Sequence, residues 1–567
     1  MVEASGWAPA AGSKHPRSEE CRVPVSVFIF RRDFRLVDNT GLMILLKAAA
    51  GQLLPIIPLF LFNPMQCDPD KNPYFGRACF EFLCQSLQHL DNVQLGGRLL
   101  CLRGSDEKCL DIIRAAGYEI RMLGFNRDIT PFARARDTRL EKWCAQHDVL
   151  CVTSRGDYTL LPTDRVVSST GSHYCVFTPF YRAVMQEHFS AISEPDLTCI
   201  AVEDVFTTLQ VKRDVEMYLR RQADACSSGC SKSDVQYVNI DDTFTPCEGR
   251  VDVGGRDEGL RCLARVAQLN DYAVVRDDIP GDKTTHLSPH LKFGTVSIRE
   301  VMQFSAKHLG KSHAFTRQLI WREFYAMLLF HNPRLTQGQL TVESASGDAM
   351  KPRGTPMVNE PFLQKYKNFR WSWDEEEFLA FKAGRTGFPL VDAAVRCLTR
   401  TGWCHNRCRM LIANFLVKVL FVDWREGERW YAQMAVDYDV ANNNGGWLWS
   451  AGQGADAQPY FRTFNPFRQS AQHDPQAVFI KRWVPELRDV PAKVIHSWDI
   501  YCSKSAAGKV GKLPDAKAQP SGSRKMQRGP ALSGSKEEYA HVAYPNPIVD
   551  VKQRTKWVIE QFKSHNR

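Results

Sequence analysis

Long apolar runs and paired cysteines are both absent from this 567-residue sequence. No run reaches the roughly 18 apolar residues that a membrane-spanning helix needs, so we expect no membrane partner. The 18 cysteines are scattered, and the nearest pairs, Cys226/Cys230 and Cys404/Cys408, have poor spacing for a zinc finger. The first 22 residues lack the apolar core of a signal peptide. The sequence therefore predicts reduced thiols, no bound metal and an intracellular protein, nuclear if the source is eukaryotic, with an organelle left open.

No GxGxxG motif follows the first apolar run, so the dinucleotide fingerprint of a Rossmann domain is missing. Strand-like runs nevertheless alternate with amphipathic helical stretches, and the runs cover residues 23–30, 52–62, 98–102, 118–125 and 148–152. This alternation predicts a Rossmann-like α/β domain with a parallel sheet over residues 23–155. A small ligand would fit at the carboxyl ends of its strands.

The rest of the chain divides by composition. Residues 1–22 are typical of a disordered leader and residues 156–258 of an irregular interdomain connection, after which periodic apolar positions predict a mostly α-helical domain over residues 259–502. Much of the net charge of +10 lies in a basic insert, residues 503–538, in which the stretch from Lys504 to Lys536 has eight lysines and arginines against one aspartate. Its Gly, Ser and Pro content predicts disorder, as a solvated loop or as an added attraction for phosphates. Residues 539–567 close the chain.

Polar and aromatic residues gather on a few helix-like segments. Trp403, Asn406, Arg407 and Met410 recur at helical spacing, which suits either a face that stacks a flat group or a partly exposed surface. The stretch ANNNGGWLW at 441–449 places an amide run beside two indoles, a combination that a site for a large flat aromatic group would use.

Other polar residues of these segments can also be explained by an ordinary structural role, such as an ion pair or a helix cap. Arg322 and Glu323 are neighbours and are expected to form an ion pair, and Arg409 and Asp437 are candidates for a second pair. Thr284, Thr285 and Ser288 precede a helix, where their hydroxyls either cap it or hold phosphate.

Taken together, these segments resemble the DNA photolyase/cryptochrome family. The resemblance lies in IWREFY, TGFPLVDAA, GWCHNR, FLVKVLFVDWREGERW and DYDVANNNGGWLWSAGQGADAQPYFRTFNP, with RRDFRLVDNTGL near the start and YPNPIVD near the end. It covers most of residues 24–502 and 539–555 and is nearest to the class I cyclobutane pyrimidine dimer photolyases. It implies an α/β antenna domain, a helical FAD-binding catalytic domain, and blue-light-driven repair of those dimers by electron transfer from reduced FAD.

The resemblance assigns residues of this chain to three groups. Matched to the phosphate and ribose side of FAD are Tyr272, Thr284, Thr285, Leu287 and Ser288, and matched to its isoalloxazine side are Arg409, Asp437, Asp439 and Asn443. Matched to an electron-transfer chain are Trp447, Trp424 and Trp371, with Trp373 a rival for the outer position. Matched to a flipped-out lesion and its DNA are Arg276, Gln318, Trp321, Asn406, Arg407, Met410 and Trp449. Asn443 would face flavin N5, where an amide hydrogen-bonds without supplying an easy proton and so favours the anionic reduced flavin.

Two departures from the family pattern bear on the activity. Gln318 stands where the family has a dimer-binding glutamate, which leaves open slower repair or a cryptochrome-type photoreceptor acting through protein partners. The (6-4) photolyases have two histidines where this chain has Asn406 and Met410, and His405 is displaced by about 100° around a helix. That difference argues against (6-4) repair.

The remaining expectations follow from the same likeness. Receptors of the family usually carry a long tail, and this chain ends soon after YPNPIVD, which favours the enzyme. The intact FAD-site matches argue against a dark DNA-binding relative. We expect a monomer whose partner is damaged DNA, and the second chromophore stays open between a folate, a deazaflavin, a flavin or none.

Overall fold

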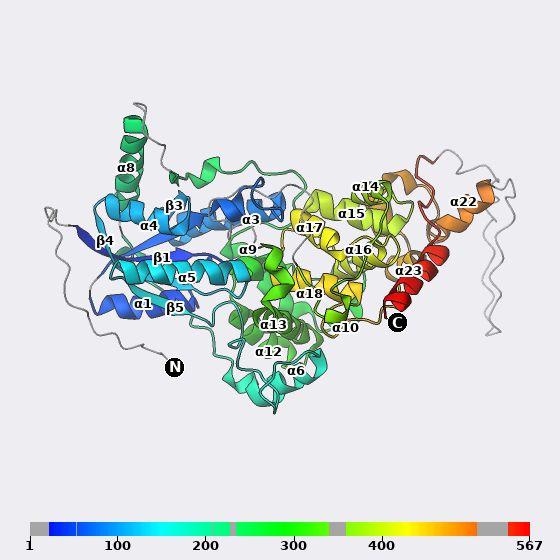
Figure 1. Ribbon diagram of the computed structural model, residues 1–567, viewed down its shortest axis with the longest axis horizontal. Coiled ribbons are helices and arrows are strands. Elements are labelled where there is room, and N and C mark those ends of the chain that lie inside the picture. Colours follow the sequence, from blue (N-terminus) through cyan, green and yellow to red (C-terminus); the bar gives the residue numbers. More distant parts are fainter. Residues whose placement is uncertain are drawn as a thin grey trace.

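The computed structural model describes residues 22–52, 54–207, 209–226, 234–339, 359–506 and 542–566. The expected leader and most of the expected basic insert lie outside the described residues. An α/β half and a helical half lie side by side along the longest axis of the molecule (Figure 1). Within the described ranges, no helix combines the length and the apolar character needed to cross a membrane.

The α/β half is built on a six-stranded sheet in the order β5-β4-β1-β2-β3-β6. Its strands are β1 (Val23–Phe30), β2 (Ile56–Phe62), β3 (Leu100–Arg103), β4 (Tyr118–Asn126), β5 (Leu150–Ser154) and β6 (Gln236–Tyr237). The first five pair in parallel, which confirms the predicted fold class, and β6 joins β3 in antiparallel. The chain order reverses between β1 and β4, and in such sheets this is where ligands bind.

Helices cover both faces of the sheet. Alternate residues of β1 enter two separate cores, with Phe28 and Phe30 in one and Val25, Val27 and Ile29 in the other. The helices on the first side are α1 (Thr40–Ala50) and α3 (Arg77–His89), and on the second α4 (Asp106–Ala115), α5 (Pro131–Gln146) and α8 (Gln210–Cys226). Burial on both faces explains why the strands appear in the sequence as nearly continuous apolar runs.

The stretch expected to be irregular contains regular structure, so that expectation was wrong in part. It holds α6 (Phe177–Ala183), α7 (Val202–Val205), α8 and the edge strand β6. Val211, Val215 and Leu219 lie on one stripe of α8 and pack against the sheet. The charged residues between them hide this stripe from a reading of composition. The division at residues 156–258 itself stays a prediction.

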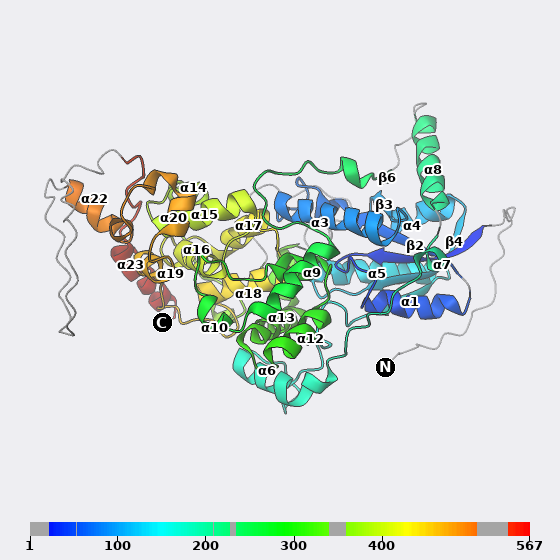
Figure 2. The same ribbon diagram turned by 180° about the vertical axis from the view of Figure 1, so that it is seen from behind.

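The second half is helical, as predicted. Its α-helices are α9 (Arg256–Ala264), α10 (Tyr272–Val275), α11 (Leu287–Phe293), α12 (Ile298–Leu309), α13 (Ala314–His331), α14 (Glu375–Lys382), α15 (Pro389–Thr401), α16 (Asn406–Lys418), α17 (Trp424–Met434), α18 (Val440–Ala451), α19 (Pro466–His473), α20 (Val478–Trp483), α21 (Ala492–Ile495), α22 (Trp498–Ala506) and α23 (Val551–His565). One large core joins α15 to α18 and takes in Trp424 and Trp447. Seen from behind, α16 and α18 lie at the centre of this half (Figure 2).

The closing segment docks back on the helical core. The Tyr544 hydroxyl donates to the buried carboxylate of Asp392 at the start of α15. At Gly387, whose φ is 77°, a Cβ atom would lie 2.3 Å from the Asn546 carbonyl oxygen, so this close approach requires glycine. The terminal helix α23 then packs Phe562 under the Nζ atom of Lys418, 4.1 Å from the ring centroid.

Candidate functional site

Helix α18 presents a partly exposed stripe within the helical half. Asn443, Gly446 and Trp449 lie on it at helical spacing and are partly exposed. A Cβ atom at Gly446 would meet no atom within 4 Å, whereas one at Gly445 would lie 2.2 Å from the Tyr325 ring. The stripe therefore borders open space, while the adjacent face is closely packed.

A segment rich in asparagine and glycine forms this helix because its surroundings hold it. The Asp439 carboxylate caps the amino end by accepting from the Asn442 backbone N–H at 3.0 Å, and Gly452 ends the helix in the left-handed conformation. The buried Asn444 amide donates to the Leu335 carbonyl and the Glu428 carboxylate, each at 3.1 Å. Caps and tertiary bonds thus offset a poor helix propensity.

A hydrogen bond to the main chain of α17 orients the Asn443 amide. Its nitrogen donates to the Glu428 carbonyl oxygen at 3.1 Å, which leaves the acceptor oxygen without a partner among the described residues. Glu428 itself is fully buried, and burial raises the pKa of its carboxyl to about 7. Behind the asparagine run, this carboxyl therefore carries less than a full negative charge near neutral pH.

The ion pair expected between Arg409 and Asp437 is confirmed. The Arg409 Nη1 atom lies 2.9 Å from the Asp437 carboxylate, and its Nε donates to the Cys404 carbonyl at 2.7 Å. Burial by itself would lower the pKa of Arg409, but the Asp437 carboxylate outweighs it and raises the pKa above its ordinary value. Because Asp437 lies three residues before the start of α18, the pair is a fixed, oriented dipole near the amino end of that helix.

Asp439 joins the two halves of the molecule. Its carboxylate pairs with Arg32, which follows β1, and accepts from the Tyr158 hydroxyl at 2.8 Å. Burial would raise the pKa of this carboxyl, but Arg32, Lys292 and other cations hold it well below its usual range. Its oxygens are thus already engaged, so its match to the isoalloxazine side remains a prediction that the contacts do not test.

Of the residues matched to the phosphate side, Thr284 and Thr285 lie in the loop before α11, and Leu287 and Ser288 are the first two residues of that helix. Thr285 and Leu287 are buried and Ser288 is exposed, and the Thr284 hydroxyl donates to Asp282 at 2.9 Å. Tyr272 lies on α10 in the helical half, and its ring meets the Phe315 ring edge-on, with the ring centroids 5.6 Å apart.

The residues matched to the lesion lie on α13 and at the start of α16. Trp321 stacks flat on Phe177, with ring centroids 3.6 Å apart and 6° between the planes, so one face of the indole is already covered. Gln318, one turn earlier, is partly exposed. On α16, Asn406 is exposed and its amide nitrogen lies 3.5 Å from the Met410 sulfur.

Two features of this region depart from the sequence expectation. Helix α16 begins at Asn406, because His405 caps it, so Trp403 precedes the helix and does not share its face. Arg407 is also engaged within the protein, since it makes a two-pronged pair with Asp277 at 2.8 and 2.7 Å, and its match to DNA contact stays a prediction. Arg276 adjoins the same carboxylate at 3.9 Å.

The three tryptophans matched to electron transfer differ in their exposure to solvent. Trp447 and Trp424 are buried in the common core, and Trp371 is partly exposed at its edge. Trp447 packs directly on α17, where a Cβ atom at Gly427 would lie 2.3 Å from the indole. The rival Trp373 is 37% exposed.

Comparisons with known proteins agree with this arrangement. A family model described as the FAD binding domain of DNA photolyase matches residues 315–564, and one described as DNA photolyase matches residues 26–196. The deoxyribodipyrimidine photo-lyase of Halobacterium salinarum is 38% identical over 564 residues, covering 95% of this chain and 99% of that protein. The chain belongs to the DNA photolyase family.

Two solved photolyase structures have the same overall fold. The archaeal photolyase from Sulfolobus tokodaii, crystallised with two FAD molecules, is 32% identical with a TM-score of 0.69, covering 95% of this chain and 99% of that one. The class III photolyase from Agrobacterium tumefaciens is 27% identical with a TM-score of 0.71, covering 97% and 100%. The helical half of this photolyase-family chain is thus its FAD-binding domain.

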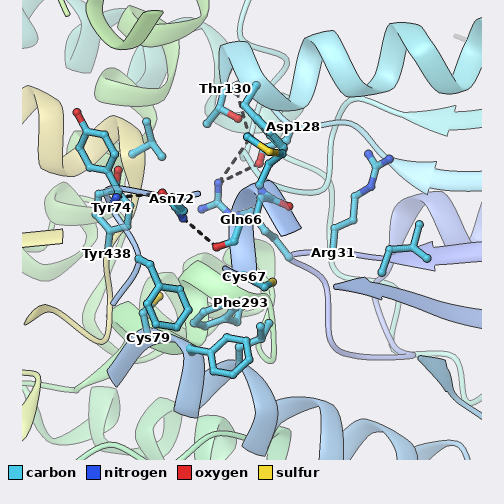
Figure 3. A pocket seen from close by; sticks show the side chains of 18 of the residues that line it. Arg31, Gln66, Cys67, Asn72, Tyr74, Cys79, Asp128, Thr130, Phe293 and Tyr438 are labelled. Carbon is cyan, nitrogen blue, oxygen red and sulfur yellow. Dashed lines mark hydrogen bonds and ion pairs between the residues drawn. The ribbon is translucent and has the colours of Figure 1, made fainter. Parts of the chain in front are cut away.

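A second cavity of about 220 Å³ lies at the switch point of the photolyase α/β half (Figure 3). Its residues include Arg31 and Arg32 after β1 and Asp128 after β4, with Lys292 and Tyr438 contributed by the helical half. The Nε and Nη2 atoms of Arg31 are buried and have no partner among the described residues. Sequence analysis placed a ligand at the strand ends but named none of these residues, although the charged RRD that follows the first apolar run is a usable signal.

Proposed function

We propose that this protein repairs cyclobutane pyrimidine dimers in DNA under blue light, with FAD bound along the open stripe of α18. The observation that carries the proposal is the stripe itself, with Asn443 and Gly446 beside the Arg409–Asp437 pair in a chain of this family. When bound, reduced FAD supplies the light-excited electron that splits the dimer.

The side chains of the chain bind and orient around that chemistry. The open face of Trp321, together with Trp449 and Met410, receives a flipped-out pair of bases by stacking and apolar contact. Gln318 and Asn406 hydrogen-bond the base edges. Arg407 and Arg276 attract the backbone phosphates, and Arg407 stays oriented by Asp277 until DNA arrives.

The repair assay uses purified protein with reduced FAD, a thymine-dimer oligonucleotide and blue light, with a dark sample and a (6-4) oligonucleotide as controls. Recovery of pyrimidine absorbance is expected for the cyclobutane dimer in light alone. Because a carboxylate accepts a stronger, charge-assisted hydrogen bond than an amide, Gln318→Glu is expected to raise the repair rate, by about tenfold at most. Absence of recovery from protein whose flavin is bound and photoreducible would contradict repair and favour a cryptochrome-type receptor.

The cavity at the switch point is proposed as the site of a second, light-harvesting chromophore. An electronegative edge on that chromophore, such as a carbonyl pair, a phosphate or a carboxylate, would meet the unpaired Nε and Nη2 atoms of Arg31. Arg31→Met is expected to lower the content of the second chromophore at least tenfold and leave the FAD content unchanged, as measured on pigments released from purified protein. Equal loss of both pigments would contradict a separate site.

A further inference from the structure

His286 is a buried histidine that is hydrogen-bonded on both ring nitrogens and that the sequence analysis did not name. Its Nδ1 lies 2.8 Å from an Asp252 oxygen, and its Nε2 lies 3.0 Å from an Asp282 oxygen. The ring stacks on Trp403, with centroids 4.1 Å apart. A neutral imidazole has one N–H, so satisfying two carboxylates requires the doubly protonated cation.

This cation ties together three segments that lie far apart in the sequence. Asp252 belongs to the connection after the α/β half, Asp282 begins the loop that carries Thr284, and Trp403 immediately precedes α16. His286 itself has φ of 56°, a left-handed conformation that is unfavourable for a residue with a side chain. The surrounding contacts must therefore hold it in place.

The charges around His286 also favour its protonated form. The Asp252 side chain is 4% exposed and its second oxygen has no partner among the described residues, so His286 is the cation that compensates it. Burial would lower the pKa of His286, but the bonds and charges of the two aspartates outweigh it and raise the pKa to about 9. The neighbouring histidines His290 and His405 are neutral at pH 7, because burial lowers the pKa of the first to about 3 and of the second to about 4.

We propose that protonated His286 is a positioning residue that holds the Thr284–Ser288 loop in the shape that grips the phosphate and ribose side of FAD, and that links this grip to the interdomain connection. The inference rests on the proposed function, and on the match of Thr284, Thr285, Leu287 and Ser288 to the phosphate and ribose side of FAD. When the ring loses its proton, one carboxylate loses its donor, and the loop between Asp282 and His286 is released.

The test follows FAD affinity against pH by the fluorescence of released FAD from the full-length protein. Since the pKa of His286 is raised in the folded state, the clamp is complete below about pH 6.5 and is lost as the pH rises through about 9. We expect affinity to fall at least tenfold across that upper step. His286→Gln should bind weakly without the step, and His308→Gln, an exposed histidine on α12, should behave as the wild type.

A second variant keeps the test independent of folding. Asp282 is exposed, and Asp282→Asn removes one of the two charges. The amide oxygen of the asparagine can still accept from the His286 Nε2–H, with the amide N–H turned to the Thr284 hydroxyl oxygen, which accepts. It should move the affinity midpoint to lower pH by about one unit, and the His286 ring resonance should titrate at the same pH. Affinity that stays flat while that resonance titrates, or a midpoint that Asp282→Asn leaves in place, would overturn the proposal. A wild-type protein that binds no FAD at any pH would instead refute the placement of FAD.

Discussion

Gly446→Leu is expected to abolish FAD binding and leave the helical half folded. The position borders open space, since a Cβ atom there meets nothing within 4 Å, and the leucine side chain would extend along the stripe that Asn443 and Trp449 share. Replacing a helical glycine also raises helix propensity by nearly 1 kcal/mol, so the free energy of unfolding should be unchanged or higher. Flavin absorbance per protein should fall at least a hundredfold, with a normal thermal melt of the apoprotein.

The neighbouring glycine provides the matched control. At Gly445 even a methyl group would lie 2.2 Å from the Tyr325 ring, which itself packs against Trp321. Gly445→Ala should therefore lower the free energy of unfolding by about 1–3 kcal/mol through overpacking, as measured by denaturant titration. If Gly446→Leu retained full flavin content, or if both variants lost only stability, FAD would not lie along this face of α18.

The α/β half was predictable because its strands are buried on both sides. A parallel strand such as β1 enters two cores and therefore appears as an uninterrupted apolar run, which composition reveals directly. Helix α8 lies at the edge, with only Val211, Val215 and Leu219 turned inward among charged neighbours, so its pattern was too sparse to recognise. Strand β6 is two residues long and exists only because it pairs with β3.

At the candidate site, helical spacing in the sequence predicted which residues share a helix face, but not the residue at which the helix begins. Asn406 and Met410 do lie one turn apart on α16, but the His405 cap ends the pattern before Trp403, whose indole instead covers His286. The helix at the asparagine run could not be predicted from propensity, because its stability comes from the Asp439 cap and from bonds to Glu428 and Leu335, which lie further away in the sequence. The same holds for the second cavity, where Lys292 and Tyr438 reach the strand ends only through tertiary packing.

Trp424→Phe is expected to block light-driven reduction of bound FAD while leaving the fold intact. Trp424 is fully buried in the helical core that also holds Trp447, with the partly exposed Trp371 packed against that core, and the family resemblance assigns it the middle place in an electron-transfer chain. Phenylalanine keeps an aromatic ring there but is far harder to oxidise. An electron that hops between indoles would then have to cross the whole gap in one step, so the rate of photoreduction should fall at least a hundredfold. The change is followed by the loss of oxidised-flavin absorbance under blue light with an external reductant.

The matched variant is Trp373→Phe, which replaces the other exposed indole near the outer end of the chain. It should photoreduce at the wild-type rate if Trp371 is the outer member, and Trp371→Phe should then be slow. Repair by chemically reduced Trp424→Phe should be normal, because the dimer receives its electron without passing through these indoles. Photoreduction at the wild-type rate in Trp424→Phe would show that electrons reach the flavin by a route other than the buried path from Trp371 to Trp447.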